Sequence, residues 1–382
     1  MDKSILNKHY QNPQPNILAD VCSKAATMDD VIDLSIGDID FTTPVAIIDD
    51  VMQEAHRGMT HYTDTRGMSE LRTTLCDYYA QHYHLKFNQD EVLITTGAEH
   101  GMYILLQAVL NPGDEVIIPE PCFSPYIDQI RMAGGIPILV PTDKNNGFRI
   151  SLAAIAQKIT DHTKAIIINS PNNPTGNVLT EEESQKLAEL AEKHNLILIS
   201  DEIYADYVMP GHSFTPLATF APHNTVTVSG MSKNFAMTGW RIGYLLGPSL
   251  IIKAAQQVND AITFAAPTLS QVGAEYALRH HDELAIPIVD KIKERLQLLE
   301  QKINELADFR VSPIGGSIYG FVDIRQTGLD SLTFANRLLE KERVLVVPGN
   351  AFGPSGEGFV RIAATKPKKA ILSAINRLGN FS

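Results

Sequence analysis

Short apolar segments alternate with helical patterns along the middle of the chain. β-Branched and other apolar residues dominate seven segments, which lie at residues 92–95, 115–118, 136–140, 164–168, 196–199, 225–228 and 243–246. Several of these segments are apolar at successive positions, which is typical of parallel strands that helices cover on both faces. The pattern therefore predicts an α/β fold with a mainly parallel sheet.

Helical patterns connect the predicted strands, for example at residues 99–110, 126–133 and 181–194. Thr180 and Glu183 form a capping-box pattern, which marks the start of the last of these helices. In open α/β sheets, ligands bind at the carboxyl ends of the strands. We therefore expect the functional residues in the loops that follow the strands.

The pattern changes after about residue 280. The expected elements are a long helix at 283–306, a strand at 318–324, a helix at 332–342, a strand at 344–347 and a closing helix that begins at Pro367. These elements predict a smaller α+β domain, and the segment before the first βα unit is expected to pack on it. We thus expect a large domain at 45–282 and a small domain formed by 1–44 and 283–382.

Length and charge restrict the function. A chain of 382 residues is long enough for two domains. Its 32 Lys and Arg residues against 44 Asp and Glu residues give a formal net charge of −12. An acidic surface repels phosphate backbones and anionic lipids, so neither a nucleic acid nor a membrane is an expected partner.

Cysteine usage and the N-terminus bear on location. Cys22, Cys76 and Cys122 form no CxxC pair, which argues against a disulfide scaffold and a cysteine zinc site and fits a reducing cytosol. The polar N-terminus has no signal-peptide pattern, and the apolar segments are shorter than a membrane span. These features predict a cytoplasmic protein.

Three loops after predicted strands, at residues 170–176, 201–204 and 229–243, carry polar residues that core packing does not require. Each loop has an ordinary explanation by itself: a turn, a helix-capping aspartate or a solvated lysine. The combination of all three, in this order, is harder to explain by packing alone.

The segment Ser-Lys-Asn-Phe-Ala-Met-Thr-Gly-Trp-Arg-Ile-Gly at 232–243, together with the two other loops, resembles the class I/II aminotransferases. These are pyridoxal-phosphate enzymes of fold type I, and the resemblance extends from about residue 34 to residue 362. It implies a large domain with a mainly parallel seven-stranded sheet, a smaller α+β domain, and pyridoxal 5'-phosphate as the cofactor.

The resemblance also implies roles for single residues. Lys233 would carry the cofactor on its amine and then act as a base on the substrate Cα–H. Asp201 would pair with the pyridine nitrogen of the cofactor. Tyr204 and Asn173 would hydrogen-bond the ring hydroxyl, and Phe123 matches the position of an aromatic ring that stacks on the cofactor.

The phosphate of the cofactor would lie at the start of a helix. Arg241 would bind it through its guanidinium fork, and Ser232 is a candidate hydroxyl ligand. Backbone N–H groups at Gly97, Ala98 and Glu99 would cradle the phosphate, because the first amides of a helix lack partners. The carboxylate of Glu99 is expected to point away from the anion.

Further positions match the substrate site of the family. Arg361 would clamp the α-carboxylate of the substrate, while Asn173 and Gly37 would lie beside it. Tyr62 matches a tyrosine that reaches the phosphate of the neighbouring subunit, which implies a homodimer with shared sites. Arg66 could read a side-chain carboxylate, although a surface arginine explains it equally well.

The leading hypothesis is an aminotransferase that moves an amino group from an L-amino acid to a 2-oxo acid such as 2-oxoglutarate. Aspartate or an aromatic amino acid is the expected donor. A carbon–sulfur β-lyase on the same scaffold is the alternative, because both reactions begin with loss of the Cα proton. A non-catalytic sensor or transcription regulator is disfavoured, since residues 1–44 are too short for a DNA-binding segment.

No metal site is expected. The twelve histidines show no ligand spacing of the HExxH or Cys/His type. His280 and His281 are expected on an exposed helix face, and His82 and His84 are expected to be solvated.

Overall fold

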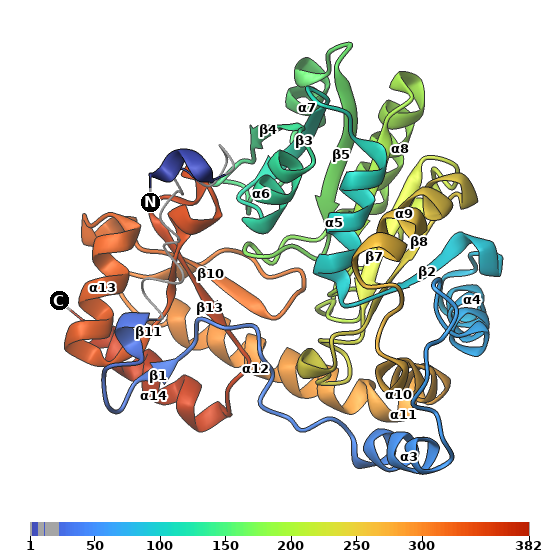
Figure 1. The fold of residues 1–382 in the computed structure, drawn as a ribbon. Coiled ribbons are helices and arrows are strands. Elements are labelled where there is room, and N and C mark those ends of the chain that lie inside the picture. The colour runs from blue at the N-terminus through green and yellow to red at the C-terminus, as the bar shows by residue number, and fades with distance from the viewer. Residues whose placement is uncertain (1, 7–10, 12–22, 382) are drawn as a thin grey trace.

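The computed structural model describes residues 2–6, 11 and 23–381 (Figure 1). The predictions for Cys22 and for most of the first 22 residues lie outside this described part. Short 3₁₀ helices lie at η1 (Lys3–Ile5), η2 (Gln89–Glu91), η3 (Leu217–Thr219), η4 (Thr238–Trp240), η5 (Arg325–Thr327), η6 (Gly349–Phe352) and η7 (Pro354–Gly356). In the part that the structure describes, no helix is both long and apolar enough to cross a membrane.

Seven strands form the large sheet. They are β2 (Val92–Thr95), β3 (Glu115–Glu120), β4 (Ile136–Pro141), β5 (Thr163–Asn169), β6 (Ile197–Asp201), β7 (Thr225–Gly230) and β8 (Gly243–Leu246). Their order in the sheet is β2-β8-β7-β6-β5-β3-β4. Strand β8 is antiparallel to both of its neighbours, and the other pairs are parallel. The mainly parallel seven-stranded sheet is thus confirmed.

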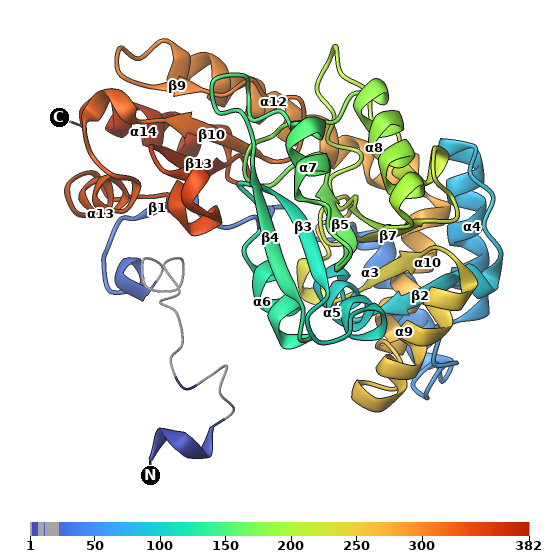
Figure 2. The same ribbon diagram turned by 90° about the horizontal axis from the view of Figure 1, so that it is seen from above.

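Helices cover both faces of this sheet. They are α3 (Val45–His56), α4 (Ser69–Tyr83), α5 (Ala98–Val109), α6 (Pro125–Met132), α7 (Leu152–Lys158), α8 (Glu181–His194), α9 (Ser249–Ile262) and α10 (Thr268–Arg279). Val116 and Ile118 share a core with α5, α6 and α9, whereas Ile117 shares one with α7 and α8 on the opposite face (Figure 2). Because successive side chains of a strand point to opposite faces, the central residues Val116, Ile117 and Ile118 of β3 are apolar on both faces.

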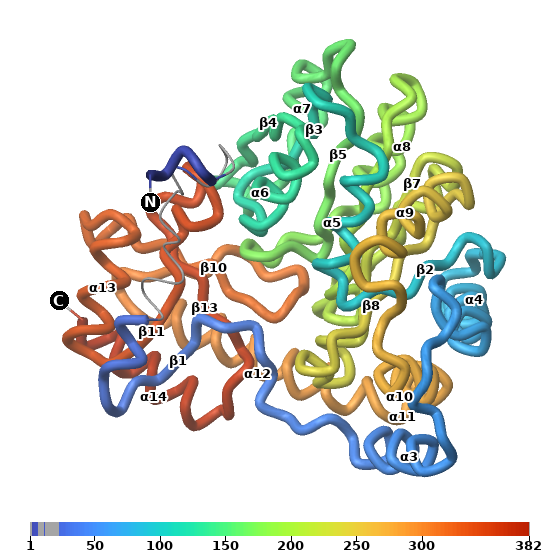
Figure 3. Tube along the Cα trace, in the orientation of Figure 1, coloured from blue at the N-terminus to red at the C-terminus, as the bar shows by residue number. Residues whose placement is uncertain are grey.

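A second group of elements lies beside the large sheet. It contains β1 (Ile32–Asp33), β9 (Arg310–Val311), β10 (Tyr319–Asp323), β11 (Val344–Leu345), β12 (Val347–Pro348), β13 (Phe359–Ala363), α11 (His281–Leu284), α12 (Ile286–Asn304), α13 (Ser331–Glu342) and α14 (Lys368–Gly379). An antiparallel sheet has the order β12-β13-β10-β9, and β1 pairs in parallel with β11. The blue tube in Figure 3 runs from β1 across to α3. The domain boundaries at 44/45 and 282/283 stay a prediction.

Local expectations differ from the structure in this second group. The helix expected at 283–306 is two helices, because Pro287 in the first turn of α12 has no N–H to continue the preceding helix. The strand expected at 344–347 is split, since Val344 pairs with β1 whereas Val347 pairs with β13. Pro367 caps α14, which begins one residue later than expected. The predicted capping box of α8 is present.

Strand β8 meets the start of α5 without any intervening side chain. A Cβ atom on Gly243 would lie 2.5 Å from the Ala98 nitrogen and 2.6 Å from the Gly97 carbonyl carbon. Both neighbours are backbone atoms, so neither can move without shifting the helix. Glycine at this position therefore sets how closely the first turn of α5 approaches the sheet.

We predict that Gly243→Ala lowers the free energy of unfolding by about 1–3 kcal/mol, because the added methyl group displaces backbone. Urea-induced unfolding measures the change. Gly239→Ala is the matched control, since a Cβ at that position meets no atom within 4 Å. Equal stabilities of the two variants would contradict this account of the contact.

Candidate functional site

Lys233 lies in the turn that follows β7, at the carboxyl end of the sheet. Its Nζ donates a hydrogen bond of 2.7 Å to the carbonyl oxygen of Gly37, which lies in the segment between β1 and α3. The hydroxyl of Tyr207 donates to the carbonyl oxygen of Lys233 at 2.8 Å. The residue is half-buried.

Asp201 ends β6 and is buried. Its carboxylate accepts hydrogen bonds from the Tyr126 hydroxyl at 2.5 Å and from the Ile203 N–H at 3.1 Å. Burial raises the pKa of Asp201, and these two donors and the charge of Lys233 oppose the rise only in part. The ring of Phe123 packs edge-on against Tyr126, with 5.5 Å between centroids. Asp201 and Phe123 are thus close together, joined by a tyrosine that the sequence analysis did not identify.

Arg361 projects from β13 and is almost fully buried. Its guanidinium donates to the Asn173 side-chain oxygen at 2.8 Å and to the carbonyl oxygen of Ser35. The guanidinium carbon lies 4.1 Å from the ring centre of Tyr319 and 4.8 Å from that of Phe352. Within the described part of the chain, the Arg361 Nε atom has no hydrogen-bond partner. An anionic group is the natural partner for this remaining donor.

Tyr319 lies between these groups, and the sequence analysis did not identify it. The Tyr204 hydroxyl donates to the Tyr319 hydroxyl at 3.2 Å, and a Cβ on Gly37 would lie 2.0 Å from that oxygen. Burial raises the pKa of Tyr319, but the charges of Arg361 and Lys233 outweigh it and lower the pKa. A tyrosine at the start of an apolar strand has no sequence signal that separates it from a core residue.

The first turn of α5 meets the guanidinium of Arg241, and the two form a corner that we call the α5 corner. A Cβ on Gly97 would lie 2.7 Å from a terminal guanidinium nitrogen of Arg241, so the arginine lies directly against this turn. Arg241 also donates to the Thr238 carbonyl oxygen at 3.0 Å. The first amides of a helix, here those of Ala98 and Glu99, lack helical acceptors and attract anions. The residue Glu99 is exposed.

Other predicted residues lie apart from this group within one chain. Tyr62 is 87% exposed and packs edge-on against Phe264. Arg66 pairs with Asp64 at 3.6 Å in a surface cleft that Lys253 also lines. These contacts do not bring either side chain to Lys233.

Ser232 is buried in the turn directly before Lys233. The prediction that His281 lies on an exposed face is wrong. Only 8% of this residue is exposed, because it begins α11 and its ring faces Asp206 and Tyr78.

The comparisons with known proteins agree with this geometry. The family model for aminotransferase class I and II matches residues 29–378. The aspartate aminotransferase of Pyrococcus horikoshii is 36% identical over 94% of this chain and 93% of that protein. Aromatic-amino-acid aminotransferase 2 of Thermococcus litoralis is 33% identical over 98% and 97%. A solved structure of Thermus thermophilus aspartate aminotransferase, single mutant 1, has a TM-score of 0.94 at 33% identity and covers 99% of both chains. This chain therefore belongs to the class I and II aminotransferases, which are pyridoxal-phosphate enzymes of fold type I.

Proposed function

We propose that this aminotransferase takes its amino group from aspartate or an aromatic L-amino acid and passes it to a 2-oxo acid such as 2-oxoglutarate. The names of the relatives from Pyrococcus horikoshii and Thermococcus litoralis support these two donor classes. Nothing in the geometry or in the comparisons favours the carbon–sulfur β-lyase alternative.

One observation carries the proposal. Lys233 and Arg361 both donate hydrogen bonds to the segment 35–37, the first at Gly37 and the second at Ser35. An amino acid whose α-carboxylate binds Arg361 would therefore present its Cα near the amine of Lys233. An aminotransferase binds the α-carboxylate of its substrate and removes the proton from the adjacent Cα. Arg361 is proposed to bind the carboxylate, and Lys233 is proposed to remove the proton.

The residues present fit pyridoxal phosphate. The α5 corner with Arg241 suits its phosphate, and the buried Asp201 suits a protonated ring nitrogen. When bound, the cofactor supplies an electron sink that stabilises negative charge at the substrate Cα. Tyr204 and Asn173 are proposed to hold its ring hydroxyl, and Phe123 is proposed to stack on its face.

The side chains then have separate tasks. Arg361 is proposed to bind the substrate carboxylate through its guanidinium and so to fix the orientation of the molecule. Lys233 Nζ is proposed to take the proton from the substrate Cα and would deliver it to the cofactor carbon that receives the amino group. Tyr126 keeps its own proton, because burial raises its pKa well above the usual value, and so it remains a donor to Asp201.

We also propose a homodimer in which Tyr62 enters the site of the neighbouring chain. A tyrosine that is 87% exposed and held against Phe264 is already extended for such a contact. Light scattering is expected to give about twice the monomer mass of 42.0 kDa. A fully active monomer would contradict the shared site.

A reducing cytoplasm is the proposed location. Cys76 and Cys122 are both free thiols. Burial raises the pKa of Cys76 to about 11 and that of Cys122 to about 12, so both stay protonated and unreactive.

A single-turnover absorbance measurement on the cofactor-loaded protein tests the donor assignment. Aspartate, tyrosine, alanine, methionine and cystathionine are added separately, without a 2-oxo acid. We expect aspartate or tyrosine to convert the visible band of the bound cofactor stoichiometrically, and 2-oxoglutarate to restore it. A persistent band with accumulating pyruvate would instead identify a lyase, and a response confined to alanine or methionine would reject the proposed donors.

We further predict that Arg361→Lys raises KM for the amino donor by roughly tenfold to a hundredfold, because a charged hydrogen bond and the planar fork are lost. Steady-state kinetics provide the measurement. Arg325→Lys is the matched control, since Arg325 also lies over a ring, that of Phe359, but pairs with Asp323. An unchanged KM in Arg361→Lys would remove this residue from substrate binding.

A further inference from the structure

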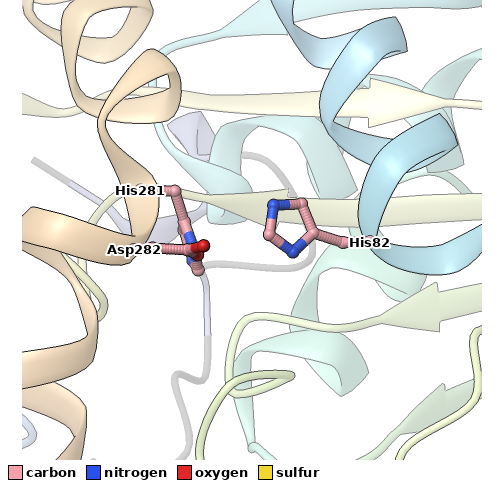
Figure 4. Close-up of side chains that lie close together, drawn as sticks. All are labelled: His82, His281 and Asp282. Atoms are coloured by element: carbon pink, nitrogen blue, oxygen red, sulfur yellow. The ribbon is translucent and has the colours of Figure 1, made fainter.

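Three ligand-bearing side chains meet where the end of α4 approaches the start of α11. His82 comes from α4, and His281 and Asp282 come from α11 (Figure 4). One ligand atom from each side chain lies within 4.8 Å of the other two. Two imidazoles and a carboxylate are a donor set that suits zinc and similar divalent transition metals.

Each ring nitrogen of His281 faces a carboxylate. The Nε2 atom lies 2.8 Å from the Asp206 carboxylate, and the Nδ1 atom lies 3.0 Å from Asp282. If Nε2 carries the proton and donates it to Asp206, the lone pair of Nδ1 faces Asp282. Metal-binding histidines commonly have such a carboxylate behind the ring, where it fixes the tautomer. Asp206, which lies outside the cluster, thus occupies the position of such a supporting carboxylate.

We propose that His82, His281 and Asp282 bind a divalent transition metal of the zinc class, with water at the remaining position. The ion would join α4 to α11, two helices from distant parts of the sequence. Asp206 also accepts a hydrogen bond of 2.5 Å from the Asn234 side chain, next to Lys233. The site is structural in this proposal, because none of its ligands touches the groups assigned to substrate.

Zinc titration of the cofactor-loaded enzyme by calorimetry tests the site. We expect one zinc ion per chain and a higher melting temperature in its presence, because a ligand that binds only the folded state stabilises it. His82→Ala and Asp282→Ala should each weaken zinc binding by about tenfold or more. Cobalt offers a second readout, since its d–d bands lie at longer wavelengths than the cofactor band.

His84→Asn is the matched control. His84 caps the same end of α4 with a left-handed backbone, which asparagine tolerates, and it is not part of the cluster. This variant should bind zinc as the unmodified enzyme does. The proposal is overturned if the unmodified enzyme binds no zinc, if either His82→Ala or Asp282→Ala retains full binding, or if His84→Asn loses binding equally.

Discussion

The burial of the Arg361 guanidinium is the constraint on which the site depends. A buried charge is costly unless it is fully hydrogen-bonded, so its partners must be held in place. Those partners are Ser35, before α3, and Asn173, in the loop after β5. One side chain thereby ties the small sheet, the large sheet and the segment that links them. The proposed substrate site lies where these three parts meet.

The parallel strands bring the remaining groups to the same place. Asp201 ends β6, and Lys233 follows β7, so adjacent carboxyl ends deliver the carboxylate and the amine side by side. Strand β8 returns antiparallel and brings Gly243 against the start of α5. The shape of the α5 corner therefore depends on a backbone contact as well as on the side chain of Arg241.

The sequence predicted the strands and helices that have a repeating pattern, and it predicted site residues only where they belong to a known motif. The strands of the large sheet were found because helices on both faces make several of them apolar at successive positions. Tyr126 and Tyr319 were missed, since an aromatic residue near apolar neighbours looks like core packing. The contact between His281 and Asp206 was also missed, because 75 residues separate them and no local spacing relates them. The break before α12 was missed as well, because Pro287 is a single residue within an otherwise helical pattern.

The bond between Arg361 and Ser35 spans 326 positions of the chain. On a ribosome, Lys233 and Asp201 emerge and can reach their sheet while the arginine has not yet been translated. A nascent chain at that stage contains Lys233 and Asp201 but not Arg361, the residue proposed to orient the amino acid. The proposed recognition of the substrate carboxylate is thus added after the residues of the large sheet have been synthesised.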